Sequence, residues 1–238
     1  MALPSEGEPQ AEGEPQESSA KLEVLEVLKG PPHGEESGEG LLFRTNRGDL
    51  RAILHRAEGS SQGVIWVYGA RGGFGGPGPG TYARLAEALL EQDITSMRLD
   101  YRQPNDLDEC MVDVLAGIAF FRAMEHEPVI LVGHSFGGAV VIAAGAASAH
   151  VKGVVSLSPQ TYGAGSVSQI SPKPILLVHG KADTRLPYVC AQQIYDAALE
   201  PKKLVLYDGA EHRLEECRDE LESLLKDWIP ATLAAQPA

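Results

Sequence analysis

Short apolar runs alternate along this chain with longer segments in which apolar residues recur every three or four positions. Strand-like runs of this kind cover residues 63–68, 94–99, 128–132, 151–157, 174–179 and 203–207. Helix-length segments separate or follow them and cover about residues 81–92, 106–124, 138–149, 189–199 and 214–228. This alternation predicts an α/β fold, in which helices pack on both faces of a mostly parallel sheet.

Two further strand-like runs, 22–28 and 50–56, open the pattern and bring the expected number of strands to roughly eight. The Gly- and Pro-rich segment from Gly30 to Gly40 joins them, and no helix-length segment lies between them. Since parallel neighbours need a long crossover connection, we expect these two strands to be antiparallel. Asp106 or Asp108 is suited to cap the helix expected at 106–124.

The first 20 residues differ in composition from the rest and are dominated by Glu, Pro, Gln, Ser and Gly. The unit Glu-Gly-Glu-Pro-Gln occurs there twice, at 6–10 and 12–16. Such a segment cannot bury enough apolar area to offset its chain entropy. We therefore expect a disordered acidic tail at 1–20, followed by a single α/β domain at 21–238.

Charge and cysteine content narrow the functional classes. A formal net charge of −13 opposes binding to nucleic acid and to anionic membrane surfaces. Cys110, Cys190 and Cys217 are too scattered for a disulfide framework or a metal site. The N-terminus lacks the pattern of a secretory signal, and the most apolar stretch, 139–147, is too short to cross a bilayer. These features favour a cytoplasmic enzyme, and they leave its oligomeric state open.

A Gly-Xaa-Ser-Xaa-Gly motif, Gly133-His134-Ser135-Phe136-Gly137, lies directly between the apolar strand at 128–132 and a helix of small residues. A strand that turns this sharply into a helix needs small residues two positions before and two after the serine. The turn also forces the serine into an unfavourable backbone conformation that presents its hydroxyl above the strand ends. Ser135 is therefore the candidate nucleophile, although a glycine-rich turn with a non-catalytic serine would match the same five-residue motif.

A serine hydroxyl needs a base, and His212 is the histidine best placed to be one. It lies in the loop that follows the last strand, at the expected carboxyl edge of the sheet. Asp183 follows the penultimate strand in the same way, and its carboxylate can orient the imidazole. Taken singly, a loop histidine is more often a surface residue and a loop aspartate more often a turn or cap residue. The chain order Ser, Asp, His after three strands is what makes the set specific.

With these motifs, nearly the whole chain after the tail resembles the α/β-hydrolase superfamily, in particular small cap-less esterases and dienelactone-hydrolase-like members. The segments His-Gly-Lys-Ala-Asp-Thr-Arg-Leu-Pro at 179–187 and Gly-Ala-Glu-His at 209–212 are similar to that family's acid and base loops. The resemblance implies an eight-stranded, mostly parallel sheet and triad roles for Ser135, Asp183 and His212. It implies no metal and no organic cofactor.

The tetrahedral intermediate of acyl transfer needs two amide donors. The amide of Phe136 is the expected first donor, and the second should come from Ala70 or Arg71, where the family often has His-Gly. The Arg71 side chain is an alternative ligand for an acidic group of the substrate, although a solvated loop arginine is the commoner case.

Only residues 158–173 separate the strand at 151–157 from the next strand, which is too short an interval for a helical cap domain. We therefore expect an open site for a small or medium ester or thioester. Four aromatic residues are candidates for the walls of its substrate pocket: Phe74, Tyr101, Tyr162 and Tyr188.

Two other functions compete with hydrolysis. The loop from Gly73 to Gly78 matches Gly-Xaa-Gly-Xaa-Xaa-Gly, and Asp100 ends the next strand, which imitates the dinucleotide-binding fingerprint of an NAD(P)-dependent oxidoreductase. Against this function, Pro77 and Pro79 remove amides that would otherwise bind phosphate. The other alternative is a hydrolase fold retained only to bind a ligand or partner, which loss of a triad residue would have favoured.

Overall fold

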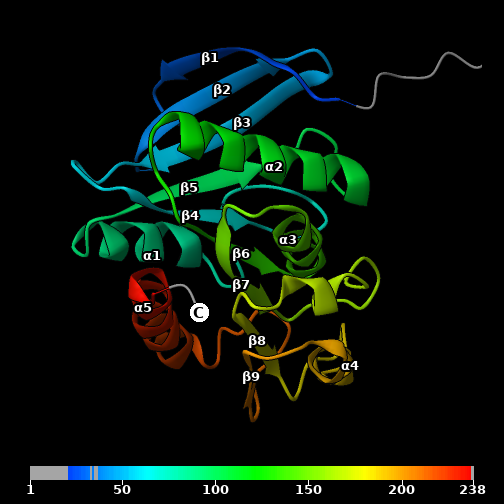
Figure 1. Ribbon diagram of the computed structural model, residues 1–238. Helices are drawn as coiled ribbons and strands as arrows, with labels where there is room; N and C mark the ends of the chain where they lie inside the picture. Colours follow the sequence, from blue (N-terminus) through cyan, green and yellow to red (C-terminus); the bar gives the residue numbers. More distant parts are fainter. Residues whose placement is uncertain (1–20, 33, 35–36, 237–238) are drawn as a thin grey trace, which may run out of the picture.

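A computed structural model describes residues 21–32, 34 and 37–236, so the expected tail at 1–20 lies outside the described residues. One mixed sheet of nine strands crosses these residues in the order β1-β2-β3-β5-β4-β6-β7-β8-β9 (Figure 1). The strands are β1 (Val24–Gly30), β2 (Glu39–Thr45), β3 (Gly48–His55), β4 (Gln62–Val67), β5 (Ile94–Asp100), β6 (Val129–His134), β7 (Val151–Leu157), β8 (Ile175–Gly180) and β9 (Lys202–Tyr207). Pairing is antiparallel from β1 to β5 and parallel from β5 to β9.

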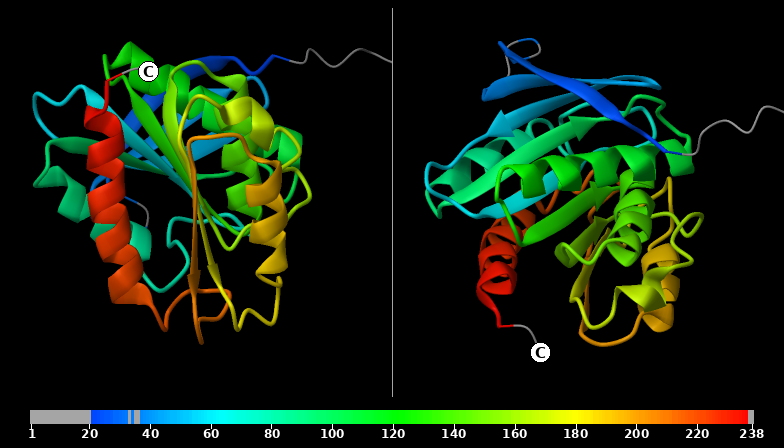
Figure 2. Two further views of the ribbon diagram at one scale, coloured as in Figure 1. Left: turned by 60° about the horizontal axis from the view of Figure 1, so that its bottom comes forward. Right: turned by 45° about the horizontal axis from the view of Figure 1, so that its top comes forward.

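Five α-helices cover the two faces of this sheet (Figure 2). They are α1 (Thr81–Leu90), α2 (Leu107–Ala123), α3 (Phe136–Ala147), α4 (Val189–Ala197) and α5 (Arg218–Ala234). Helices α1 and α5 bury their apolar sides on one face, and α2, α3 and α4 bury theirs on the other. The predicted α/β architecture is therefore confirmed.

The central strand β6 shows why this sheet needs helices on both faces. Its residues alternate between the two cores, because successive side chains of a strand point to opposite faces. Val129 and Leu131 pack into the core beneath α2 and α3, whereas Ile130 and Val132 pack into the core beneath α1 and α5. All four are fully buried, which explains why the strand is an uninterrupted apolar run in the sequence.

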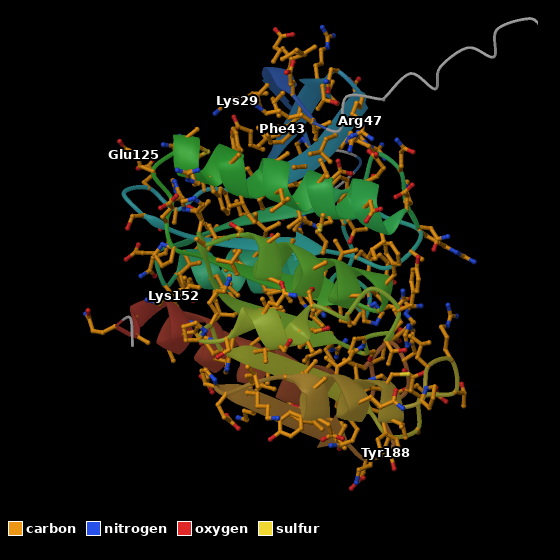
Figure 3. The ribbon with its side chains drawn as sticks, turned by 45° about the vertical axis from the view of Figure 1, so that its right-hand side comes forward. Lys29, Phe43, Arg47, Glu125, Lys152 and Tyr188 are labelled. Carbon is orange, nitrogen blue, oxygen red and sulfur yellow. The ribbon has the colours of Figure 1, made fainter. Side chains whose placement is uncertain are left out.

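The pattern analysis missed strand β2, and its prediction for the opening strands is wrong in one respect. Strands β1 and β3 are not antiparallel neighbours, because β2 lies between them and is antiparallel to both. A tight turn at Asn46 and Arg47 joins β2 to β3, and Gly48 adopts a φ of 105° there. In β2, Phe43 packs edge to face on Phe120 of α2, with 5.0 Å between ring centroids (Figure 3).

The boundaries of α2 and α5 illustrate local control of helix ends. Asp106 caps α2 as expected, since its side chain accepts a hydrogen bond from the amide of Glu109 at 3.1 Å. Helix α5 begins later than predicted, because Leu214 has a φ of 52° and lies in a turn before it. It continues beyond residue 228 to Ala234, since Leu233 is buried against the sheet.

Residues 158–173 form no cap domain and contain only a short 3₁₀ helix, η1 (Val167–Ile170). In the part of the chain that the structure describes, no helix is long and apolar enough to cross a membrane.

A buried ion pair fixes α2 to the end of β5. Asp113 accepts hydrogen bonds from the backbone amide of Arg102 at 2.9 Å and from the Arg102 guanidinium, and the two side chains are 0% and 2% exposed. We expect Asp113→Ala to lower the free energy of unfolding by about 1–3 kcal/mol, because the buried Nε–H and backbone amide of Arg102 lose their acceptor while Glu109 still pairs with the guanidinium at 2.8 Å. Urea denaturation followed by circular dichroism measures the change.

The exposed Asp108 on the same helix provides the matched control for this variant. Asp108→Ala should cost less than about 1 kcal/mol, since it removes only a favourable charge near the helix N-terminus. Equal effects of the two substitutions would contradict a structural role for the buried pair.

Candidate active site

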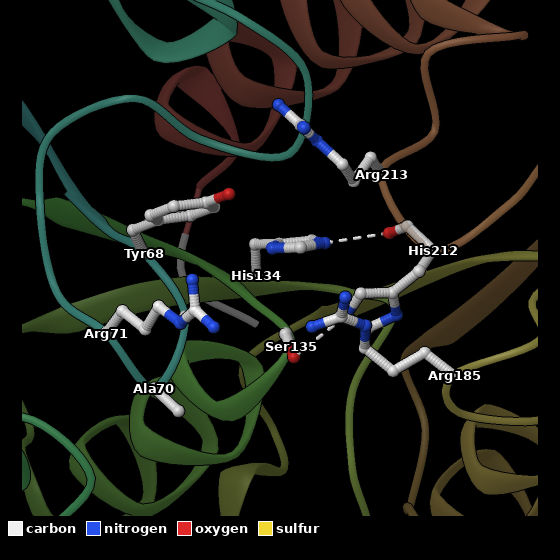
Figure 4. A pocket seen from close by; sticks show the side chains of 9 residues that line it. Tyr68, Ala70, Arg71, His134, Ser135, Arg185, His212 and Arg213 are labelled. Carbon is white, nitrogen blue, oxygen red and sulfur yellow. Dashed lines mark hydrogen bonds between the residues drawn. The ribbon is translucent and has the colours of Figure 1, made fainter.

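The carboxyl ends of β4, β6, β8 and β9 border a pocket of about 300 Å³, seen from close by in Figure 4. Its lining comes from the loops that follow these strands and comprises Tyr68, Gly69, Ala70, Arg71, His134, Ser135, Arg185, His212 and Arg213. Parallel strands end at the same edge of a sheet, so residues far apart in the sequence meet here.

Ser135 lies in a strained turn between β6 and α3, with φ 59° and ψ −119°. The turn depends on two glycines. A Cβ atom at Gly133 would lie 2.1 Å from the carbonyl oxygen of Gly137, and one at Gly137 would lie 2.1 Å from the carbonyl oxygen of Tyr68. Neither position can carry a side chain without a backbone shift, which is the steric requirement of a nucleophile elbow.

The structure brings Ser135, Asp183 and His212 together. Nε2 of His212 lies 3.0 Å from Oγ of Ser135, and Nδ1 lies 2.7 Å from Oδ2 of Asp183 (Figure 4 shows the first contact). These distances join hydroxyl, imidazole and carboxylate in one hydrogen-bonded chain. The arrangement can move a proton from the hydroxyl to the ring while the carboxylate holds the ring in place.

The carboxylate of Asp183 is held as an anion. Its Oδ1 accepts hydrogen bonds from the amides of Arg185 and Leu186 at 2.9 and 2.8 Å, and its Oδ2 faces the rings of His212 and His179. Burial opposes its ionisation, but the hydrogen bonds from Leu186 and His212 outweigh burial, so the pKa of Asp183 lies below its usual range.

His179, the penultimate residue of β8, is a second imidazole on this carboxylate, and the sequence analysis did not include it among the site residues. Its Nε2 lies 3.0 Å from Oδ2 of Asp183 and 2.9 Å from the carbonyl oxygen of Leu186. A carbonyl only accepts, so the ring carries its hydrogen on Nε2 and donates to both oxygens. Burial lowers the pKa of His179, which keeps the ring neutral. The signal available in the sequence was its position four residues before Asp183.

His134 supports the loop that carries His212. Its Nε2 donates to the carbonyl oxygen of His212 at 2.9 Å, and its ring stacks on Tyr68 with 5.5 Å between centroids. Burial lowers the pKa of His134 to about 3, so the ring is neutral and the hydrogen bond depends on a single tautomer. Like His179, it is a neutral residue beside the reactive group rather than a second base.

Two groups of backbone amides lie close to Ser135 in the chain or in the pocket lining. Phe136 is the first residue of α3, so its N–H has no partner within the helix. Ala70 and Arg71 occupy the centre of a turn closed by a hydrogen bond of 3.0 Å from Gly72 to Gly69, which uses neither of their amides. Both residues line the pocket, which makes their amides candidate oxyanion donors.

None of the four aromatic residues expected in the pocket walls is among its lining residues in the described chain. Tyr101 is buried and donates to the carbonyl oxygen of Tyr68 at 3.2 Å. Tyr162 is 73% exposed, and Tyr188 projects from the surface (Figure 3). Phe74 is half-buried in the loop after β4, where its carbonyl accepts a hydrogen bond from the Arg98 side chain.

Contacts with the side chains of Asp100 and Tyr82 hold the loop from Gly73 to Gly78 in place. The amide of Gly73 donates to Oδ1 of Asp100 at 2.5 Å, and Gly76 packs on the ring of Tyr82, where a Cβ atom would lie 2.7 Å away. Asp100, which a dinucleotide-binding site would use on a ribose, also pairs with Arg51. Gly76 thus serves close packing, whereas Gly73 meets no atom within 4 Å and serves the turn by its φ of 97°. Within the described residues, no group of His, Cys, Asp or Glu side chains is arranged to hold a metal ion.

Comparison with known proteins agrees with this geometry. Residues 61–235 match the Alpha/beta hydrolase family. The match covers most of the chain, which therefore belongs to the α/β hydrolase family. A stretch of 46 residues is 44% identical to the uncharacterized protein YfhR of Escherichia coli K12, but it covers only 19% of this chain and 16% of that relative.

Several solved structures share the whole fold. Est1E from Butyrivibrio proteoclasticus is 18% identical, with a TM-score of 0.72, over 84% of this chain and 100% of that one. Dienelactone hydrolase from Anabaena variabilis is 17% identical, with the same score and coverage. XC6422 from Xanthomonas campestris, described as a serine hydrolase without lid, is 21% identical, with a TM-score of 0.63, over 87% and 100%. At these identities the likeness establishes the fold alone.

The steric role of Gly133 can be tested by adding a single methyl group. Gly133→Ala should abolish reaction of Ser135 with a serine-directed probe and lower the melting temperature, because its Cβ overlaps the backbone of Gly137. Gly165→Ala is the matched control, since a Cβ atom there meets no atom within 4 Å. Normal probe labelling in Gly133→Ala would contradict the elbow geometry.

Proposed function

We propose that this hydrolase cleaves a small or medium carboxylic ester or thioester through an acyl-enzyme on Ser135. The observation that carries the proposal is the continuous contact from Ser135 Oγ to His212 Nε2 and from His212 Nδ1 to Asp183. A serine in a strained elbow with this contact is the arrangement that nucleophilic acyl transfer requires. The cap-less fold and the esterase relatives support the same reaction class.

The reaction follows from the roles of the three side chains. Oγ of Ser135 attacks the carbonyl carbon while its proton passes to Nε2 of His212, and Asp183 stabilises the imidazolium that forms. The amides of Phe136 and of Ala70 or Arg71 bind the developing oxyanion. The imidazolium then gives its proton to the departing alcohol or thiol. Water, deprotonated in turn by His212, releases the acid and restores the serine.

The size of the site supports a small substrate. The pocket of about 300 Å³ has no cap domain over it in the described residues, and this volume suits a small or medium acyl group. No cofactor is needed for this reaction, since the chain supplies nucleophile, base and oxyanion donors. A non-catalytic binding role would not require the serine and base to lie within hydrogen-bond distance.

We also propose that the enzyme is cytoplasmic, and its cysteines support this location. All three cysteines are free thiols, and Cys110 and Cys217 are buried. Burial raises the pKa of Cys110 to about 12 and that of Cys217 to about 11, so both remain protonated and unreactive. Unpaired structural thiols of this kind are typical of a reducing compartment.

A fluorophosphonate probe tests the nucleophile directly. The wild-type protein should be labelled on Ser135, and Ser135→Ala should lose both labelling and more than about 10³-fold of its ester hydrolysis. Intact-protein mass spectrometry measures the adduct. Ser168→Ala, which removes an exposed serine outside the pocket, is the control and should be labelled normally. An unlabelled wild-type protein would overturn the proposal.

The pH dependence tests the base. Activity should fall as the pH is lowered through the acidic range, because a protonated imidazole can no longer accept a proton from serine. Because the pKa of Asp183 is lowered, that carboxylate stays ionised in this range. His134 and His179 have lowered pKa values and stay neutral, so the decline of kcat/KM should follow the protonation of a single group. Flat kcat/KM down to about pH 4 would exclude His212 as the base.

A further inference from the structure

The charge of the pocket is opposite to that of the protein. The whole chain has a formal net charge of −13, yet the pocket lining contains three arginines and neither Asp nor Glu. Two of these arginines, Arg71 and Arg185, come from different loops, one after β4 and one after β8. A positive site on an acidic protein indicates a ligand of negative charge, because its local field attracts anions that the rest of the surface repels.

Arg71 and Arg185 have no ion pair with a carboxylate among the described residues, although both lie at the mouth of the pocket. Figure 4 shows their guanidinium groups directed toward each other from opposite sides of Ser135. Arg213 differs, since its Nε contacts Glu215 at 2.9 Å and the carbonyl oxygen of Pro77 at 3.2 Å. In the same view its side chain points away from the serine.

Four carboxylates lie near Arg185, and each has another partner: Asp183 contacts His212, Glu215 contacts Arg213, and Glu211 and Glu216 accept hydrogen bonds within the loops. Oε2 of Glu211 accepts hydrogen bonds from the amide and hydroxyl of Thr184, both at 3.0 Å. Oε2 of Glu216 accepts one from the amide of Glu211 at 3.0 Å. These contacts hold both carboxylates in the acid and base loops. Both guanidinium groups line the pocket without a carboxylate partner, so an anion bound there would lower the electrostatic energy of the site.

We propose that the substrate is an ester or thioester that carries a second, unesterified carboxylate, held by Arg71 and Arg185 while the scissile carbonyl lies at Ser135. The inference rests on the proposed function and adds the substrate class. Carboxylate is favoured because its planar pair of oxygens matches the guanidinium fork, and a pocket of about 300 Å³ suits a small acid. Arg71 then has two separate roles, with its amide a candidate oxyanion donor and its side chain an anion ligand.

Matched pairs of esters test the proposal and locate the carboxylate. In the first pair, 4-acetoxybenzoate and its methyl ester differ in the charge of the leaving group. In the second, the mono(4-nitrophenyl) ester of adipate and 4-nitrophenyl hexanoate differ in the charge of the acyl group. Each kcat/KM is divided by the hydroxide rate constant of the same ester. We expect the charged member of at least one pair to be favoured by about tenfold or more, as hydrogen bonds to a charged group imply.

Substitution of the arginines should remove this preference. Arg71→Gln and Arg185→Gln should each reduce the charged-to-neutral ratio by about tenfold, and Arg71→Lys and Arg185→Lys should retain part of it. The lysine variants keep the charge and therefore separate electrostatic recognition from loop geometry. Arg218→Gln, at the exposed start of α5 outside the pocket, is the control and should leave the ratio unchanged.

Failure of this inference is distinguishable from failure of the proposed function. Suppose that Ser135 is labelled and both neutral esters are hydrolysed, but the wild-type protein prefers the charged ester by less than about tenfold in both pairs. The carboxylate site is then refuted, and the proposed hydrolase function stands. A wild-type preference that persists in both glutamine variants refutes it equally. If Ser135 is not labelled and no ester is hydrolysed, the proposed function itself fails, and the inference falls with it.

Discussion

The turn from β6 into α3 is the constraint on which the rest of this protein depends. Two carbonyl groups occupy the space that side chains at Gly133 and Gly137 would need, so the chain can turn only because both residues lack a Cβ atom. The turn places Ser135 at a φ of 59° and exposes its hydroxyl at the rim of the sheet. The strain is tolerated because β6 is buried on both faces and α3 is packed against it, so neither element can move to relieve it.

Around that serine, two neutral histidines and the Asp183 carboxylate lie on the buried side, and two arginines lie on the open side. On the buried side, His134 and His179 are neutral rings that donate hydrogen bonds, one to the His212 backbone and the other to Asp183. They leave Asp183 as the buried anion that the proposed base contacts. On the open side, Arg71 and Arg185 extend toward the same hydroxyl. Asp183 can thus compensate a positive charge on His212, while the two arginines keep the pocket positive toward an incoming substrate.

The sheet supplies the geometry for both sides. Parallel pairing from β5 to β9 brings the ends of β4, β6, β8 and β9 to one edge, where the loops with Arg71, Ser135, Asp183 and His212 meet. The antiparallel strands β1 to β3 extend the sheet away from this edge (Figure 1). They complete the core under α2, as the contact between Phe43 and Phe120 shows, and they contribute no residue to the pocket lining. Their role in the described chain is structural.

Local signals in the sequence were sufficient to predict the α/β class, the central strands and the three candidate residues, because an apolar run, a glycine-flanked serine and loop residues after strands can each be recognised within a few positions. It did not reveal β2, whose start follows a Gly- and Pro-rich segment and whose partners lie on both sides of it. It led us to expect Phe74, Tyr101, Tyr162 and Tyr188 in the pocket walls, where the structure has none of them, and it did not identify His179 and Arg185 as parts of the site. These features depend on the folded chain, since the partners of a side chain come from several strands and loops, and residue type alone does not encode the direction in which a side chain points.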